Sequence, residues 1–311
     1  MCAIMGFSTK KLDKSEIPAY FDRTVSRGPD MSRIMDTGSG WLCFHRLAIM
    51  GLTEAGMQPF ELDGDMVVCN GELYGFRPVK AMLEAKGYQF QSDSDCEIIL
   101  PLWQEYGTDM FAGLDAEFAM IIYDSASDSL VAARDPIGIR PLFYGYLADG
   151  SIFASEAKNL VGLCAHVFPF PPGHYYKDGK FVRYADLTTV TRYSDDDLDT
   201  VTKKIREKLI SAVEKRLDAD APLGFLLSGG LDSSLVCAIS AKLLGKKIRT
   251  FAIGMASREL KDEEAAQLTG TAIALDGIAV IVNPANTIDE LSMDQIKSIY
   301  VGDITDWGDL A

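Results

Sequence analysis

The sequence lacks the long apolar runs, paired cysteines and histidine clusters that mark several protein classes. No run of about 18 apolar residues occurs, and the opening MCAIMGF has no charged segment before an apolar stretch. We therefore expect a soluble, unexported, cytoplasmic protein. The six cysteines are scattered without a C-x-x-C pair, which predicts reduced thiols rather than disulfides or a zinc ribbon. Three dispersed histidines are too few for a histidine-based metal site.

An excess of basic charge is also missing. The formal net charge is −15, which argues against nucleic acid or an anionic membrane as a partner. An acidic protein that handles a nucleotide must bind it through a local device, such as a loop of backbone amides. The expected partners are therefore small molecules.

The first half of the chain is dominated by short β-type runs separated by Gly, Asp and Pro. These runs are 3–8, 41–47, 65–73, 117–124, 129–135, 142–147 and 151–155. Two stretches, 78–87 and 94–107, read as helices, the second with Ser94 as a candidate cap. This order predicts an α+β domain with stacked, mostly antiparallel sheets over residues 1–190.

The second half alternates helices and strands. Helices are expected over 193–217, 233–245, 262–275 and 287–300, and strands over 223–228, 247–254 and 278–282. Such alternation is typical of a parallel sheet with crossover helices. We place this α/β domain over residues 191–311, after a polar, acidic boundary at 186–197.

A glycine-rich string, LLSGGLDSSLV, lies between the first strand and helix of that domain. Gly229 and Gly230 allow a tight turn that brings backbone N–H groups to an anion, next to a helix N-terminus. Serine hydroxyls can add donors, and Asp232 can hold a magnesium ion on a polyphosphate. A turn that only caps a helix is the simpler interpretation, and no Walker A pattern is present. The whole string favours a phosphate site.

Cys2 directly follows the initiator methionine. Removal of Met1 would leave Cys2 carrying both a thiol and the α-amine of the chain, whose ordinary pKa is about 7.7–8.0. One residue would then supply nucleophile and base. The thiol would attack an amide carbonyl, expel ammonia and leave a thioester for water to hydrolyse.

Four further residues suit this chemistry. Asn70 and Gly71 can donate N–H groups to an oxyanion, Arg46 suits a substrate carboxylate, and Asp95 can pair with a substrate ammonium. Together they describe a pocket for glutamine. Singly, each also has a structural explanation, as a turn, a surface charge or a helix-start residue.

Two groups of motifs resemble known families. SGGLDS and the later TFAIG resemble the PP-loop ATP pyrophosphatases, which adenylate a carboxylate or carbonyl oxygen and release pyrophosphate. Cys2 with RGPD, HRLAI, NGELY, SDCE, ARDPIGIRPLFYG, FASEAKNL and PPG, in that order, resembles the class II glutamine amidotransferase domain, an N-terminal-nucleophile fold. In combination the chain resembles the glutamine-hydrolysing asparagine synthetases.

That resemblance implies a set of roles. Cys2 would be the nucleophile, with Asn70 and Gly71 as oxyanion donors. The residues implied in glutamine binding are Arg46, Leu47, Ile49, Asn70, Gly71, Glu72 and Asp95. The residues implied in ATP binding are Leu226, Leu227, Ser228, Gly229, Gly230, Leu231, Asp232, Ser233, Ser234 and Ile253, with Asp232 toward magnesium. ATP and Mg²⁺ would enter as a substrate complex, without a tightly bound prosthetic group, and ammonia would pass to an aspartyl adenylate to give asparagine.

The chain departs from the family pattern in three places. Ala3 stands where a glycine usually follows the nucleophile, and Gly75 stands where asparagine is usual. The sequence stops at GDITDWGDLA, before the S-G-E-G-x-D-E element and the lysine of the amide-forming step. We therefore expect an incomplete α/β domain, from a truncated chain or one completed by a homodimer or a second subunit.

Alternative functions also fit the sequence. They are a glutaminase whose synthetase half is non-functional, a β-lactam-synthetase-like amide-forming enzyme, and a catalytically silent regulatory subunit that binds glutamine or nucleotide.

Overall fold

A computed structural model describes residues 1–252, which belong to one compact unit, Met1–Ile253. The elements expected over 262–275, 278–282 and 287–300 lie outside the described residues, as does Ile253. Among the described helices, none is both long and apolar enough to cross a membrane.

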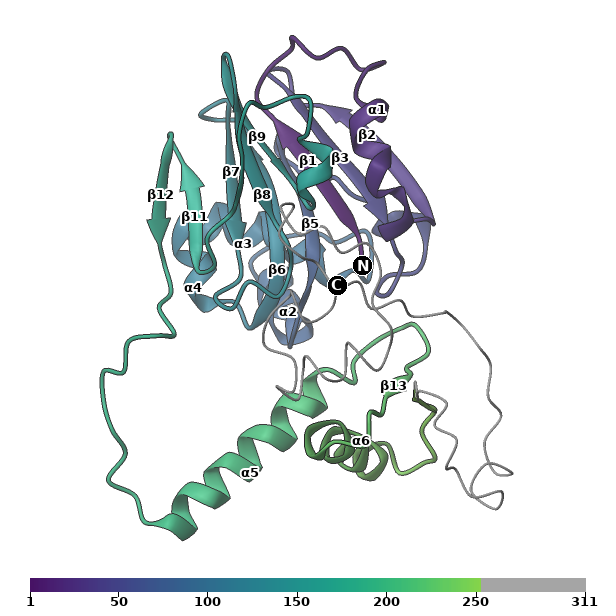
Figure 1. Cartoon of the computed structure of the whole chain (residues 1–311), viewed down its shortest axis with the longest axis vertical. Helices are drawn as coiled ribbons and strands as arrows, with labels where there is room; N and C mark the ends of the chain where they lie inside the picture. The colour runs from purple at the N-terminus through teal and green to yellow at the C-terminus, as the bar shows by residue number, and fades with distance from the viewer. Residues whose placement is uncertain (253–311) are drawn as a thin grey trace, which may run out of the picture. The chain divides into compact units, whose positions relative to one another are not determined.

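The amino-terminal part is built from two six-stranded sheets (Figure 1). The first has the order β10 (Val167–Pro169), β8 (Phe143–Leu147), β9 (Gly150–Ala154), β1 (Ala3–Phe7), β3 (Trp41–Arg46) and β2 (Met31–Asp36). The second has the order β12 (Lys180–Arg183), β11 (His174–Lys177), β7 (Ser129–Arg134), β6 (Ala116–Asp124), β5 (Asp65–Leu73) and β4 (Phe60–Leu62). Neighbouring strands in both sheets pair antiparallel, so the predicted stacked antiparallel architecture is confirmed.

The two sheets face each other across an apolar layer. Alternate residues of β1 and β5, such as Ile4 and Val68, belong to this layer together with Phe44, Ile121 and Phe153. The intervening residues of each strand point to the opposite face of its sheet, as a period of two requires. The central strands are therefore buried on both faces, which explains their near-continuous apolar runs.

Helices cover the outer faces of the sandwich. α2 (Phe76–Ala85), α3 (Ile99–Tyr106) and α4 (Met110–Gly113) pack on the second sheet, where they share an apolar cluster with β5 and β6 (Figure 1). α1 (Pro18–Phe21) and the 3₁₀ turn η1 (Asp22–Arg27) lie beside β3 on the first sheet. Pro101 lies in the first turn of α3. Backbone N–H groups in the first turn of a helix have no partner within that helix, so a proline is tolerated there.

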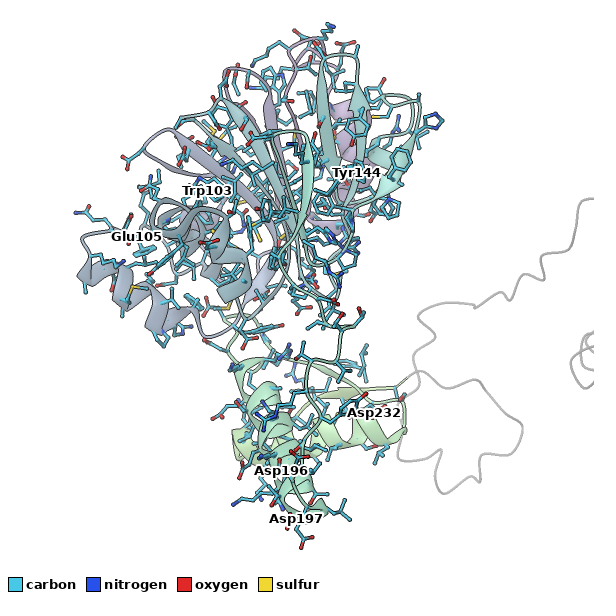
Figure 2. All side chains as sticks on the ribbon, turned by 90° about the vertical axis from the view of Figure 1, so that its left-hand side faces the viewer. Trp103, Glu105, Tyr144, Asp196, Asp197 and Asp232 are labelled. Carbon is cyan, nitrogen blue, oxygen red and sulfur yellow. The ribbon has the colours of Figure 1, made fainter. Side chains whose placement is uncertain are left out.

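The second part supplies a strand–loop–helix unit. α5 (Leu198–Lys215) starts at Asp197, whose side chain accepts a hydrogen bond from Thr200 N (2.8 Å; Figure 2). β13 (Phe225–Leu226) pairs parallel with β14 (Thr250–Phe251), and α6 (Leu231–Leu244) connects them. The predicted parallel pairing is confirmed for these two strands, which are shorter than expected.

Several elements differ from the sequence expectations. Ser94 makes no side-chain cap, and the segment after it begins as a 3₁₀ turn, η3 (Asp95–Ile98), before α3. Helix α6 begins two residues earlier than expected, at Leu231. The pattern missed β2, β4, β10 and the hairpin β11–β12, all of which are short or half-exposed.

Candidate functional site

Cys2 lies immediately before β1, and three contacts hold it in place. Leu47 N donates to Cys2 Sγ (3.4 Å), and Sγ lies 3.6 Å from Leu47 O. Arg27 Nε donates to Cys2 O (3.1 Å), while the Arg27 guanidinium pairs with Glu156 (2.9 Å). Burial raises the pKa of the Cys2 thiol above its usual value, so the resting sulfur is neutral and needs a base to act as a nucleophile.

The amino terminus lies beside this thiol. Burial lowers the pKa of the Met1 terminal amine below its usual value, while the nearby Cys2 opposes that shift. A lowered amine pKa increases the fraction of neutral amine near pH 7, which is the form that can accept a proton. Removal of Met1 would transfer this amine role to Cys2 itself.

Asn70 and Gly71 lie within β5, across the sandwich from β1. Asn70 is 2% exposed, and its Nδ2 has no hydrogen-bond partner among the residues described. A buried unpaired amide donor costs about 1–3 kcal/mol, so its retention beside a cysteine points to a ligand oxygen as its partner. A Cβ at Gly71 would lie 2.7 Å from Glu117 O and 2.9 Å from Phe118 Cβ, so only glycine fits there.

Two carboxylates, those of Glu72 and Asp95, lie near Asn70 and Gly71. Asp95 Oδ2 accepts from Leu73 N (2.7 Å), which ties the start of η3 to the end of β5. Burial, and then the neighbouring Asp95, raise the pKa of Glu72 to about 8. Burial also raises the pKa of Asp95. The buried Asp95 and the half-buried Glu72, whose ionisation is disfavoured, suit a cationic group placed near both.

Arg46, at the end of β3, is 3% exposed and supports a loop as well as facing the cavity. Its terminal nitrogens donate to the carbonyl oxygens of Thr53 (2.7 Å), Met50 (3.4 Å) and Gly51. Burial lowers the pKa of the Arg46 guanidinium. A planar cation held from one side by three carbonyls is pre-oriented for an anion on its other side.

These groups share one cavity. All eight residues predicted for the nucleophile and glutamine pocket line it: Cys2, Arg46, Leu47, Ile49, Asn70, Gly71, Glu72 and Asp95. Sequence reasoning missed further lining residues, namely Met1, Phe44, Met50, Gly56, Gln58, Cys69, Ser94, Cys96 and Arg140.

Arg140 is the most informative of the missed residues. It is buried, its Nε has no partner within residues 1–252, and it lies 3.6 Å from Glu117 Oε1. Asp135 orders the loop that carries it, because its carboxylate accepts from the backbone N–H groups of Gly138 (2.6 Å), Ile139 (2.9 Å) and Arg140 (3.0 Å). The motif ARDPIGIRP contained this signal, an acidic residue followed by a glycine turn and a buried arginine.

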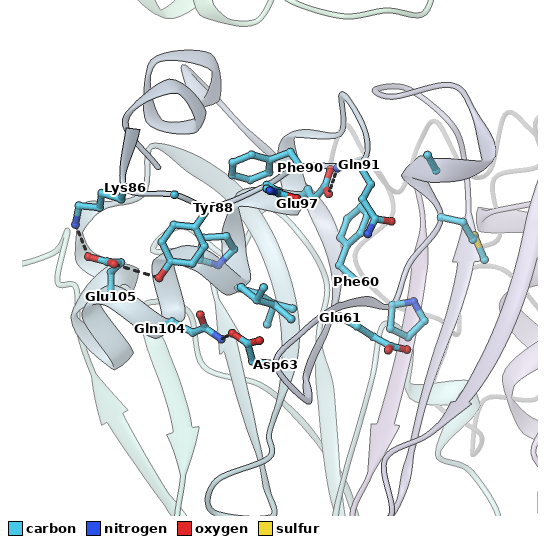
Figure 3. A pocket seen from close by; sticks show the side chains of 18 of the residues that line it. Phe60, Glu61, Asp63, Lys86, Tyr88, Phe90, Gln91, Glu97, Gln104 and Glu105 are labelled. Carbon is cyan, nitrogen blue, oxygen red and sulfur yellow. Dashed lines mark hydrogen bonds and ion pairs between the residues drawn. The ribbon is translucent and has the colours of Figure 1, made fainter. Parts of the chain in front are cut away.

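A larger groove of about 910 Å³ lies elsewhere, between β4, the segment 86–91 and α3 (Figure 3). Its acidic groups are largely already engaged. Glu97 accepts from Gln91 N and Ser92 N (2.6 and 2.9 Å), Glu105 pairs with Lys86, and Gln104 donates to Asp63. The groove contains no cysteine, so its size does not make it the chemical centre.

The glycine loop joins β13 to α6. Gly229 has φ +82°, a conformation that favours glycine, and the turn is closed by Ser228 Oγ to Ser233 Oγ (3.0 Å). Asp232 lies exposed in the first turn of α6 (Figure 2). The predicted nucleotide residues from Leu226 to Ser234 thus form a strand–turn–helix unit with backbone N–H groups at a helix N-terminus. Within residues 1–252, no cluster of three His, Cys, Asp or Glu side chains could hold a metal ion.

Comparison with known families agrees with this geometry. Residues 1–172, more than half of the chain, match the model of the glutamine amidotransferase domain. The chain belongs to the glutamine amidotransferase domain family. Residues 204–301 match the asparagine synthase model.

Individual relatives carry both activities in their names. The chain is 38% identical over 257 residues to a probable glutamine-hydrolysing asparagine synthetase of Dictyostelium discoideum, covering 78% of this chain and 46% of that protein. It is 41% identical over 223 residues to one from Schizosaccharomyces pombe (70% and 40%), and 37% identical over 287 residues to one from Zea mays (84% and 47%). The chain therefore spans about half the length of the curated relatives it matches.

Among solved structures, the glutamine phosphoribosylpyrophosphate amidotransferase of B. subtilis is similar in fold. It matches with a TM-score of 0.51 at 18% identity, covering 86% of this chain and 71% of that one. This likeness supports the N-terminal-nucleophile fold of stacked antiparallel sheets.

Proposed function

We propose that this chain hydrolyses glutamine at Cys2 and delivers the ammonia to an ATP-dependent asparagine synthetase reaction. The observation that carries the first step is that the Asn70 Nδ2, which has no partner in the described part of the chain, lies in the same cavity as the Cys2 thiol. An amide donor without a partner is what a developing oxyanion requires.

The chemistry follows from the groups in the cavity. After removal of Met1, the α-amine of Cys2 takes the thiol proton and Sγ attacks the side-chain amide carbon of glutamine. The carbonyl oxygen becomes an oxyanion that accepts from Asn70 and Gly71. Collapse of that intermediate breaks the C–N bond, and the amine returns the proton to the departing ammonia. Water then cleaves the thioester to give glutamate and the free thiol.

The rest of the pocket would hold the amino-acid end of glutamine. Its α-carboxylate would face the Arg46 guanidinium, with Leu47 and Ile49 alongside. Its ammonium would lie against Glu72 and Asp95, whose charged forms it would favour. This assignment explains why a buried cavity retains two carboxylates with raised pKa values.

The second step rests on the glycine loop and on the names of the relatives. Ser228 to Ser234 would bind the phosphates of ATP, with Asp232 toward the Mg²⁺ that accompanies the nucleotide as substrate. Aspartate would be adenylated with release of pyrophosphate, and ammonia would displace AMP to form asparagine. The domain limits 1–190 and 191–311, and a cytoplasmic location, belong to this proposal.

The test is amino-acid analysis of the chain incubated with glutamine, aspartate, ATP and Mg²⁺. We expect glutamate release from the parent, none from Cys2→Ala, and unchanged release from Cys164→Ala, a half-buried cysteine outside the cavity. Glutamate release by Cys2→Ala would refute the nucleophile. Asparagine alongside glutamate supports the complete reaction, whereas glutamate alone limits this chain to the glutaminase step. An Asp232→Ala variant should bind MgATP more weakly in calorimetry.

A further inference from the structure

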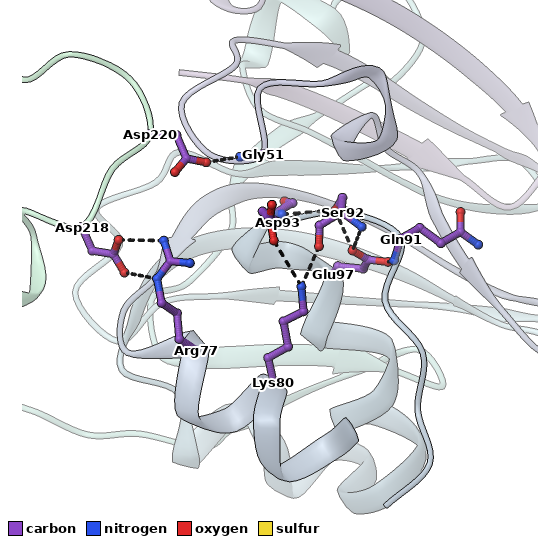
Figure 4. Close-up of polar contacts among 10 residues, drawn as sticks. Gly51, Arg77, Lys80, Gln91, Ser92, Asp93, Glu97, Asp218 and Asp220 are labelled. Atoms are coloured by element: carbon purple, nitrogen blue, oxygen red, sulfur yellow. Dashed lines mark hydrogen bonds and ion pairs between the residues drawn. The ribbon is translucent and has the colours of Figure 1, made fainter. Parts of the chain in front are cut away.

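Two hydrogen bonds from the second half of the chain hold the loop 49–51 beside the glutamine pocket. The segment 216–221 leaves α5 and continues into β13, which leads to the glycine loop. Within that segment, Asp220 Oδ2 accepts from Gly51 N (2.8 Å; Figure 4), and Ala221 N donates to Ile49 O (3.1 Å). Two hydrogen bonds thus hold both ends of the stretch from Ile49 to Gly51.

That stretch also forms a wall of the pocket. Ile49 and Met50 line the cavity, and the carbonyls of Met50 and Gly51 accept from the Arg46 guanidinium. Arg46 therefore holds the loop from inside the cavity, while Asp220 and Ala221 hold it from outside.

The loop has little freedom to find another position. Gly51 is buried at φ +56°, and a Cβ there would lie 2.7 Å from Ser94 N, next to Asp95 of the carboxylate pair. A shift of Gly51 would therefore move two sides of the pocket, the Arg46 side and the Asp95 side.

We propose that Asp220, which lies outside the amidotransferase domain, is a positioning residue for glutamine binding. It acts through Gly51 and Arg46 and touches no reacting atom. The inference rests on the proposed glutamine hydrolysis, and it makes the affinity for glutamine depend on the segment that leads into the glycine loop.

Asp218 provides a matched control two residues away. Its carboxylate pairs with the Arg77 side chain on α2 (3.0 and 2.9 Å; Figure 4), and within residues 1–252 it forms no hydrogen bond to the loop 49–51. Both aspartates are exposed, so replacing either leaves no buried cavity. If the substitutions only loosened the segment 216–221, replacing either aspartate would weaken glutamine binding. If Asp220 positions the pocket, only its replacement would do so.

The experiment measures kcat and KM for glutamine in Asp220→Ala, Asp220→Asn and Asp218→Ala. We expect Asp220→Ala to raise KM about tenfold, equivalent to about 1.4 kcal/mol, with kcat within about twofold of the parent. Asp220→Asn retains an oxygen that can accept from Gly51 N, and should recover KM to within about threefold. Asp218→Ala should match the parent.

Calorimetry in a Cys2→Ala background separates this inference from the proposed function, because it reads glutamine binding without hydrolysis. Parent-like glutamine affinity in Asp220→Ala, or equal losses in Asp220→Ala and Asp218→Ala, would overturn the role of Asp220 while leaving glutamine hydrolysis intact. Absence of glutamine binding in the Cys2→Ala chain itself would instead overturn the proposed function, and the role of Asp220 with it.

Discussion

Asn70 on β5 of one sheet and Cys2, immediately before β1 of the other, line a single cavity, and the Asn70 Nδ2 has no hydrogen-bond partner among residues 1–252. The two residues are 68 positions apart and come together only because the sheets stack. The two stacked sheets thus place a nucleophile and a hydrogen-bond donor on opposite sides of one cavity. This arrangement pre-organises a site for acyl transfer.

Replacing Asn70 by alanine should separate stability from catalysis. The side-chain Nδ2 is buried without a partner among the residues that the structure describes, so its removal relieves a desolvation cost, and the melting temperature should stay level or rise. The oxyanion would lose one donor, so kcat for glutamine should fall by about 10²–10³ with little change in KM. Steady-state kinetics and a thermal melt test both. A large loss of stability with unchanged kcat would assign Asn70 a structural role.

Glu72→Gln should change the pH dependence of stability. The native pKa of Glu72 is about 8 against a usual 4.5, so the folded state holds a proton that the unfolded chain releases between these values. The free energy of unfolding therefore falls as pH rises from about 4.5 to 8. The Glu72→Gln side chain does not ionise, so the variant lacks this pH-dependent loss of stability. The melting-temperature advantage of Glu72→Gln over the parent should grow between pH 5 and pH 8.

The same variant should bind glutamine more weakly, with KM raised about tenfold or more, because a charge partner of the substrate ammonium is lost. Glu61→Gln, at an exposed position on β4, serves as the control and should alter neither property. A pH-independent difference in melting temperature between Glu72→Gln and the parent would contradict the assignment.

Ala3→Gly restores the family residue and should not accelerate hydrolysis. The Ala3 side chain belongs to the apolar cluster on the outer face of the first sheet, with Phe7 and Phe21, and not to the cavity of Cys2. Loss of its methyl and added backbone freedom should cost about 1–2 kcal/mol of stability. Ala154→Gly, in the same cluster, should cost a similar amount. A clear rise in kcat for Ala3→Gly alone would mean that the methyl crowds the site.

Gly229→Ala should weaken MgATP binding. Its φ of +82° is unfavourable for any residue with a Cβ, by about 1–2 kcal/mol, so the loop would have to reshape. We expect about a tenfold loss of affinity by calorimetry. Gly245→Ala imposes the same kind of strain at φ +61° at the other end of α6, and should leave the affinity unchanged. Equal MgATP affinities in Gly229→Ala and Gly245→Ala would contradict a role of the glycine loop in nucleotide binding.

Sequence reasoning predicted the sandwich because its central strands are buried on both faces and read as strong apolar runs. It missed β4 and the β11–β12 hairpin, although Asp63-Gly64 and Asp178-Gly179 carry the Asp-Gly turn pattern with positive φ at both residues. These strands are short and carry little apolar signal, so the turn was the better indicator.

For the site, short motifs were enough to select the residues that meet around Cys2, but not the residues that position them. Arg140 lines the cavity from a loop that Asp135 organises by hydrogen bonds, and Asp220, from the other half of the chain, contacts the loop 49–51 beside that cavity. Contacts between segments so distant in sequence leave no local pattern, so only the folded structure could reveal them.

The central claim is that Cys2 forms a covalent bond with glutamine, and the most direct measurement is an acid-quenched intact mass followed by peptide mapping. We expect the mass of a chain that has lost Met1. During turnover, we expect that chain to carry one glutamyl group as a thioester on its amino-terminal peptide. Glutamate release without any adduct at Cys2, or turnover by a chain that retains Met1, would contradict it.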